Sequence, residues 1–192
     1  MSKKKEYIYN NIVFDSKEEI EFQIFLDEAK EHGLIDSYIY QPPSYELIPK
    51  ATYKDAKGKE RTLFRAHNYT ADWIIHPTEL FDELDHGLKK SYDGTYIVDI
   101  KGTYNKNGGD RILPIHAKLL YNKFGLILNK IVPEEFFKKA NIAPEGLRWN
   151  QNVKKEKRLR KAFEKLDSFD AFKKRVNEKK ETGKQININY FS

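Results

Sequence analysis

The chain has 192 residues, of which 39% are hydrophobic and 33% are charged, and its net charge is +6 at pH 7. This length fits one cored domain plus an appendage, and the apolar content is too high for a disordered chain. With no cysteine, disulfides and thiolate metal sites are excluded. No stretch has the pattern of a signal peptide or a membrane span, so we expect a cytoplasmic protein that is not attached to a membrane.

The first predicted element is a helix over residues 16–32. Apolar residues recur there at intervals of three and four, and Gly33 follows as a helix stop. Ser16 and Glu19 have the spacing of a capping box, in which two side chains satisfy free backbone N–H groups at the start of a helix. Glu19 therefore has a structural role to weigh against a role in a site.

Strand signals follow the helix. Runs rich in aromatic and branched residues, separated by prolines, glycines and polar turns, predict strands at 35–41, 45–48, 61–75 and 95–101. A polar turn is predicted at 54–59. The acidic segment 77–94, between the two longer strands, is expected to form a wide hairpin connection.

The remaining elements are mostly helical. A helix over 114–124, ended by Gly125, leads to a short apolar strand at 126–132, and another helix is predicted over 133–140. A strand that is reached through a helix can pair in parallel with the strand before it. The order therefore indicates an α/β fold with a mixed β-sheet flanked by helices.

Positive charge is concentrated near the carboxyl terminus. Residues 150–184 contain 13 Lys or Arg against 6 Asp or Glu, which leaves the rest of the chain near neutral. We therefore divide the chain into a domain at 1–149 and a basic helical arm at 150–192. Such an arm suits a polyanionic partner, although a solvated helix without a partner is the alternative. Its apolar stripe could also join two chains into a homodimer.

The strand at 95–101 ends in a candidate site. Asp99 and Lys101 are two residues apart and project from one face of the strand, while Ile100 points into the core. The spacing alone means little, because an acidic residue followed two positions later by Lys occurs five times, at Asp15, Glu28, Asp55, Asp99 and Glu178. Only the Asp99 case lies in a strongly apolar strand, and that context makes it the candidate.

Asp72 is a second carboxylate in an apolar strand, where an unpaired charge is costly. Two carboxylates on neighbouring strands repel each other unless a cation lies between them. This pattern favours Mg²⁺, with Mn²⁺ as a substitute. The alternative is a buried salt bridge from Asp72 to Lys101 or Arg65 without any catalysis.

These residues belong to a set of motifs that carries a family resemblance. In chain order the motifs are Phe14-Asp15-Ser16-Lys17-Glu18-Glu19, Gln41-Pro42, Arg65-Ala66, Tyr69-Thr70-Ala71-Asp72-Trp73 and Val98-Asp99-Ile100-Lys101-Gly102. Together they resemble the PD-(D/E)XK superfamily, which includes restriction endonucleases, Holliday junction resolvases, RecB-type nucleases and TnsA. The closest resemblance is to its small phage-type nucleases. It covers 9–132, with Ala71 in place of the usual proline, and implies a restriction endonuclease-like αβββαβ core.

The resemblance also implies a function. The chain would be a metal-dependent DNA endonuclease, phage-encoded and active in the host cytoplasm, that hydrolyses branched or specific duplex DNA. Asp72, Asp99 and the Ile100 carbonyl would hold Mg²⁺, with Glu19 joining directly or through water. Lys101 would activate water and stabilise the reacting phosphate.

Several assignments stay open at the level of sequence. Glu18 or Glu21 could face the site in place of Glu19. The residues expected to contact DNA, from the resemblance and from the charge of the arm, are Arg65, Lys118, Lys154, Lys155, Arg158 and Lys161. One other function class is a catalytically silent DNA-binding or recombination accessory protein with the nuclease fold. Another is an inhibitor or adaptor that docks on a sheet edge through strand-like residues 186–191.

Overall fold

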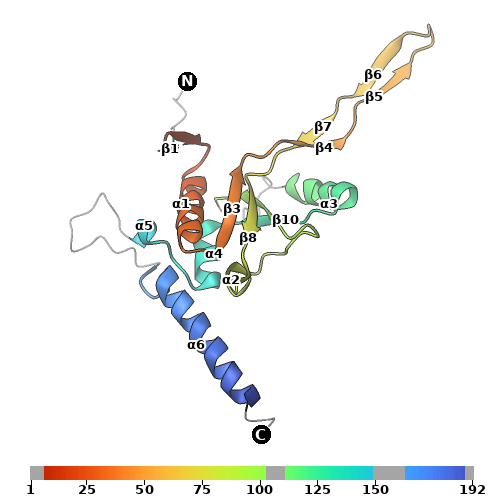
Figure 1. Ribbon diagram of the computed structural model, residues 1–192. Coiled ribbons are helices and arrows are strands. Elements are labelled where there is room, and N and C mark those ends of the chain that lie inside the picture. The colour runs from red at the N-terminus through yellow and green to blue at the C-terminus, as the bar shows by residue number, and fades with distance from the viewer. Residues whose placement is uncertain (1–6, 103–110, 149–162, 189–192) are drawn as a thin grey trace.

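The computed structural model of the protein describes residues 7–102, 111–148 and 163–188 (Figure 1). The strands are β1 Tyr7–Tyr9, β2 Ile12–Phe14, β3 Ile35–Tyr40, β4 Tyr45–Ile48, β5 Ala51–Lys54, β6 Glu60–Phe64, β7 His67–Tyr69, β8 Trp73–Pro77, β9 Tyr96–Ile100 and β10 Leu128–Ile131. The helices are α1 Lys17–Glu31, α2 Glu79–Asp82, α3 Leu113–Phe124, α4 Pro133–Ala140, α5 Glu145–Arg148 and α6 Phe169–Ile188.

A four-stranded sheet lies at the centre, in the order β10-β9-β8-β3. β3, β8 and β9 pair antiparallel, whereas β10 pairs parallel with β9 after the chain has crossed through α3. The parallel pair requires this crossover, because a tight turn can join only antiparallel strands. The expected α/β fold with a mixed sheet and a helical crossover is confirmed.

The first helix begins as the capping signal predicts. Ser16 is the N-cap, and its hydroxyl oxygen accepts a hydrogen bond from the Glu19 backbone N–H at 3.2 Å. The Glu19 carboxylate accepts from the Ser16 hydroxyl at 3.0 Å and from the Asp15 N–H at 3.2 Å. The return bond of the box thus reaches one residue further back than the usual pattern. The helix ends before Gly33, whose positive φ of 73° suits glycine.

The two faces of the central sheet bury different clusters. On one face Trp73, Val98 and Ile100 pack with aromatic side chains of α1, α4 and α6. On the other face Ile74 and Ile97 pack with the apolar side of α3. The largest fully buried side chains of the first cluster are Trp73, Phe22, Phe25, Phe81, Phe137, Phe163 and Phe172.

The prediction of one strand over 61–75 is wrong. The segment is divided into β6, β7 and the first part of β8, which pair with β5, β4 and β3 respectively. An unbroken strand of this length would extend roughly 50 Å, far beyond its short partner strands. The chain therefore leaves strand geometry between these pieces and changes partners.

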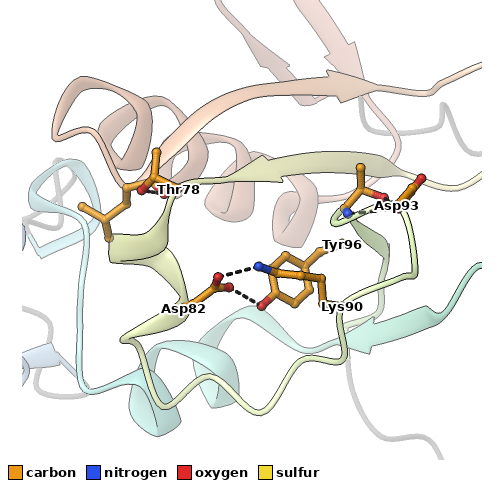
Figure 2. Close-up of polar contacts among 7 residues, drawn as sticks. Thr78, Asp82, Lys90, Asp93 and Tyr96 are labelled. Carbon is orange, nitrogen blue, oxygen red and sulfur yellow. Dashed lines mark hydrogen bonds and ion pairs between the residues drawn. The ribbon is translucent and has the colours of Figure 1, made fainter.

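The connection between β8 and β9 is fastened to the sheet by polar contacts (Figure 2). The Thr78 hydroxyl donates to the Leu34 carbonyl at 2.7 Å. At α2, Asp82 accepts from the Tyr96 hydroxyl at 2.7 Å and pairs with the Lys90 ammonium. The predicted wide connection is therefore present, and it includes the short helix α2.

The carboxyl-terminal arm contributes to the main core. Phe169, Phe172 and Val176 on α6 are buried in the first cluster, together with Phe163. The predicted apolar stripe is thus used within the chain, and these side chains are not available to a second copy. The strand-like reading of 186–191 is wrong up to Ile188, because the anchored helix continues through it. None of the helices within 7–102, 111–148 and 163–188 has the length and apolar character needed to cross a membrane.

Candidate active site

The pairing of β8 with β9 brings the two predicted carboxylates together. Trp73 lies opposite Val98, and the backbone N–H of Asp72 donates to the Val98 carbonyl at 3.0 Å. Asp72, at the bend just before β8, therefore lies beside Asp99 on β9. By strand alternation both side chains point to the face of the sheet that α3 covers. Two residues distant in sequence thus form one site.

Hydrogen bonds hold both carboxylates in place. Asp72 Oδ2 accepts from the Ile100 backbone N–H at 2.6 Å, and Asp99 Oδ2 accepts from the Tyr69 hydroxyl at 2.8 Å. The Lys101 ammonium forms an ion pair with Asp99 Oδ1. Asp99 and Lys101 are therefore side by side as predicted, and Ile100 is buried in the main core. The sequence left open an ion pair between Asp72 and Lys101, and in the structure Lys101 pairs with Asp99.

The electrostatics of Asp72 report how close the acidic groups are. Burial and then the negative charge of Asp99 raise the pKa of Asp72 to about 7, with a smaller contribution from Glu19. The Ile100 N–H and the Lys101 ammonium act in the opposite direction. Near neutral pH the Asp72 carboxyl therefore retains a proton in part of the molecules, as expected for a carboxyl that is desolvated beside another carboxylate.

The first helix supplies the third predicted carboxylate. Glu19 is buried, and its Oε2 accepts from the Tyr40 hydroxyl at 3.2 Å in addition to the capping contacts. Glu18 instead lies close to Gly102 in the loop after β9. A side-chain Cβ at that glycine would be 3.4 Å from the Glu18 Oε1 atom. Glu21 pairs along the helix with Lys17 at 3.1 Å. Of the three candidates, Glu19 is the one whose charge acts on Asp72.

The site can be tested for its fit to a hard divalent cation. Asp72 and Asp99 supply the oxygen ligands that Mg²⁺ prefers, although Asp99 Oδ1 is already paired with the Lys101 ammonium. In the same part of the chain, no group of three His, Asp or Glu side chains is arranged as a ligand cluster. The type of ligand therefore fits, with two neighbouring side-chain ligands and Glu19 set apart from them.

Aromatic residues complete the α3 side of the site, and sequence reasoning missed their roles. Tyr69 is buried against Asp99, and its ring centroid lies 4.7 Å from that of His116 on α3. The Nε2 atoms of His116 and His67 are 2.9 Å apart. Burial and then the nearby His67 lower the pKa of His116. No local spacing predicts this pair, because the two histidines lie on separate elements.

Other predicted residues take different positions. The backbone N–H of Gln41 donates to the Asp72 carbonyl at 2.8 Å, and its side chain donates to the Tyr40 hydroxyl at 3.2 Å. Arg65 is exposed on the rim of an apolar groove, which it lines together with His67, and Lys118 is exposed on α3. The remaining DNA-contact candidates, Lys154, Lys155, Arg158 and Lys161, lie outside the described residues.

The arrangement places the buried Asp99 carboxylate beside the half-buried Asp72 carboxylate and an adjacent ammonium, on the α3 side of the sheet. Such a set can hold a cation, share a proton or orient a water molecule. Comparison of the chain with protein-family models, with curated proteins and with solved structures found no match.

Proposed function

We propose that the chain is a metal-dependent DNA nuclease of the PD-(D/E)XK type, which hydrolyses phosphodiester bonds. The observation that carries the proposal is the pairing of Asp72 with Asp99 on adjacent antiparallel strands, with Lys101 in contact with Asp99. The element order α1-β3-β8-β9-α3-β10 also follows the αβββαβ order of a restriction endonuclease-like core. A bound divalent cation would relieve the electrostatic repulsion between carboxylates placed in this way.

Each residue then has a defined role. Asp72 and Asp99, with the Ile100 carbonyl, would hold Mg²⁺ or Mn²⁺, and Glu19 would join through its carboxylate or a water. The cation would polarise the phosphate and lower the pKa of a bound water. Lys101 is a compact cation that can orient the attacking water and offset the negative charge that develops on the phosphate.

A cleavage panel tests the proposal. Plasmid, single-stranded and four-way-junction DNA are incubated with the protein in Mg²⁺, Mn²⁺ or EDTA, and products are resolved on gels. We expect products with either metal, none in EDTA, and a preference for branched or specific duplex DNA. Absence of products from every substrate and metal would contradict the proposal.

A matched control separates the site from the tripeptide spacing. Asp99→Ala and Lys101→Ala should each abolish cleavage. Glu178→Ala and Lys180→Ala alter another acidic residue and lysine two positions apart, on the exposed surface of α6, and should leave cleavage unchanged. Equal loss in both pairs would show that the effect does not arise at the β9 site.

A second function is favoured by one observation. Asp99 is already engaged by Tyr69 and Lys101, and no three-residue ligand group is assembled in the described part of the chain. A catalytically silent DNA-binding or recombination accessory protein could keep a site in which Asp99 is occupied by side chains of the chain itself. It would bind DNA in the same panel without metal-dependent products.

A further inference from the structure

A β-hairpin projects from the body of the molecule beyond the candidate site (Figure 1). β5 and β6 pair with each other in a separate two-stranded sheet. Every residue of β6 is exposed, and so are three of the four in β5. From Ala51 to the tip the ribbon extends roughly 20 Å. A hairpin with so little buried surface has no evident role in stabilising the core.

The tip of the hairpin is ordered by one side chain. The Asp55 carboxylate accepts from the backbone N–H groups of Lys57 at 2.9 Å and Lys59 at 3.0 Å. It also accepts from Arg61 Nε at 3.0 Å, and Gly58 supplies the positive φ of 75° that the turn requires. The turn therefore holds a fixed shape from which the lysine side chains extend into solvent.

The hairpin is strongly basic. Residues 50–65 contain six Lys or Arg and two Asp or Glu, although the whole chain has a net charge of only +6. Both acidic side chains are engaged within the hairpin, Asp55 as above and Glu60 by the Thr52 hydroxyl at 2.8 Å. The field that the ribbon presents to a partner is therefore positive.

Exposed aromatic side chains accompany the charge. Tyr53 lies opposite Arg61, and Ala51 lies opposite Phe64 after a register shift between Ala51 and Thr52. Because Ala51 and Tyr53 are two positions apart on β5, their partners Arg61 and Phe64 lie on the same face of the ribbon as Tyr53. Tyr53 is 51% exposed and Phe64 is 46% exposed. Tyrosine and arginine on one surface suit contacts with sugars and base edges, whereas lysines suit phosphates.

The base of the hairpin is connected to the candidate site. The chain leaves β6 through Arg65 and enters β7, whose last residue, Tyr69, donates to Asp99. A partner held along the ribbon would therefore be positioned next to the carboxylate pair.

We propose that the β5-β6 hairpin is an arm that lies in the major groove of duplex DNA flanking the bond to be cut, an inference that rests on the proposed nuclease function. The major groove admits a two-stranded β-ribbon, and the lysines would neutralise phosphates along its edges. Pairing with a strand of another protein is disfavoured, because lysines on an exposed edge oppose such pairing.

The test removes three of the six positive charges of the hairpin and keeps the Asp55 contacts that shape its turn. In a triple variant, Lys54→Ala, Lys57→Ala and Lys59→Ala, the Asp55 contacts to backbone N–H groups and to Arg61 are retained. Binding to a labelled 30-base-pair duplex is measured by fluorescence anisotropy in EDTA at several salt concentrations. We expect affinity to fall at least tenfold near 0.15 M salt, and the slope of log K against log salt to decrease by about two to three.

The matched control carries the same change in net charge on α1 and α4, as Lys30→Ala, Lys138→Ala and Lys139→Ala. These exposed lysines lie on helices that cover the face of the sheet opposite α3, and the variant should bind as the wild type does. The loss in the hairpin variant should be greater for duplex than for a single strand of equal length. Equal losses for both would overturn insertion into a groove.

The outcomes separate this inference from the proposed function. If the wild type neither binds nor cuts DNA, the nuclease proposal itself is wrong. If the wild type cuts DNA and the hairpin variant binds DNA as tightly as the wild type does, only the proposal for the β5-β6 hairpin is wrong. Self-association that is lost in Tyr53→Ala and Phe64→Ala, with unchanged DNA affinity, would identify the hairpin as a protein-docking arm and overturn the proposal. Circular dichroism confirms that each variant is folded.

Discussion

The two faces of the central sheet have different roles. One face is closed by α1, α4 and α6 with an almost wholly apolar, aromatic-rich cluster. The other face meets α3 and contains Asp72, Asp99, Tyr69 and the histidine pair. Carboxylates that repel each other lower stability, and they persist only where the rest of the fold compensates. The apolar face stabilises the sheet, and under the proposed function the opposite face carries the chemistry.

Mutations on the two faces should have opposite effects on cleavage and on stability, and the largest effect is expected at Asp99. Asp99→Asn should lower the cleavage rate by about a thousandfold or more, because it removes several kcal/mol of transition-state stabilisation. The free energy of unfolding should change by much less, because the lost ion pair and the relieved repulsion between Asp99 and Asp72 act in opposite directions. Cleavage assays and urea unfolding measure the two effects.

Phe172→Ala should give the opposite result. This side chain is buried at the interface of α6 with the core, and truncation of such a ring costs about 3–5 kcal/mol. The cleavage rate per folded molecule should remain that of the wild type. A variant that unfolds like the wild type would show that α6 contributes little to the core, and a folded variant without activity would break the division between the faces.

The pH dependence of the free energy of unfolding tests the α3 face at a single residue, Asp72. The pKa of Asp72 rises from 3.8 to about 7 on folding, so the folded state keeps a proton that the unfolded state releases between about pH 4 and pH 7. Below pH 4 the Asp72 carboxyl does not lower the free energy of unfolding. As pH rises to 7 it lowers the free energy of unfolding progressively, by at most about 4 kcal/mol.

Asp72→Asn should remove that cost. In EDTA the variant should therefore be more stable than the wild type at pH 8, and the difference should shrink toward pH 4. Mg²⁺ should stabilise the wild type at pH 8 and have little effect on the variant. Chemical unfolding at both pH values checks this, and a constant difference across the range would contradict the assigned pKa.

The smallest expected effect concerns Tyr69. Tyr69→Phe removes the hydroxyl that donates to Asp99, a charged acceptor, and should cost about 1–3 kcal/mol of stability. We expect about a tenfold loss of cleavage, partly restored at higher Mg²⁺, because the hydroxyl positions the carboxylate. Tyr121→Phe on the exposed side of α3 is the control and should alter neither quantity.

Local signals predicted the elements that surround the site. Alternation and apolar runs placed the central strands, and the capping pattern placed the start of α1 at Ser16. Asp99 and Lys101 could be paired from their spacing, because neighbours two apart on a strand share a face. Asp72 was also predicted to lie near this pair, because its carboxylate falls in an apolar strand that was expected to neighbour the strand of Asp99.

The rest depended on information that no local window contains. The His67–His116 contact joins residues 49 positions apart. The division of 61–75 follows from the lengths of partner strands, and the projecting hairpin follows from that division. The apolar stripe of α6 was visible, but its packing partner was not, because an amphipathic helix does not specify which surface it covers.

The packing of α6 also affects how the chain reaches its native state during synthesis. The central sheet is complete at β10, yet part of the surface of the first cluster stays open until Phe169 and Phe172 have left the ribosome. A nascent chain that ends near residue 150 would expose aromatic surface, the condition under which partly folded proteins aggregate. Native closure of the core is therefore a late event, and the basic carboxyl-terminal arm is the segment that completes it.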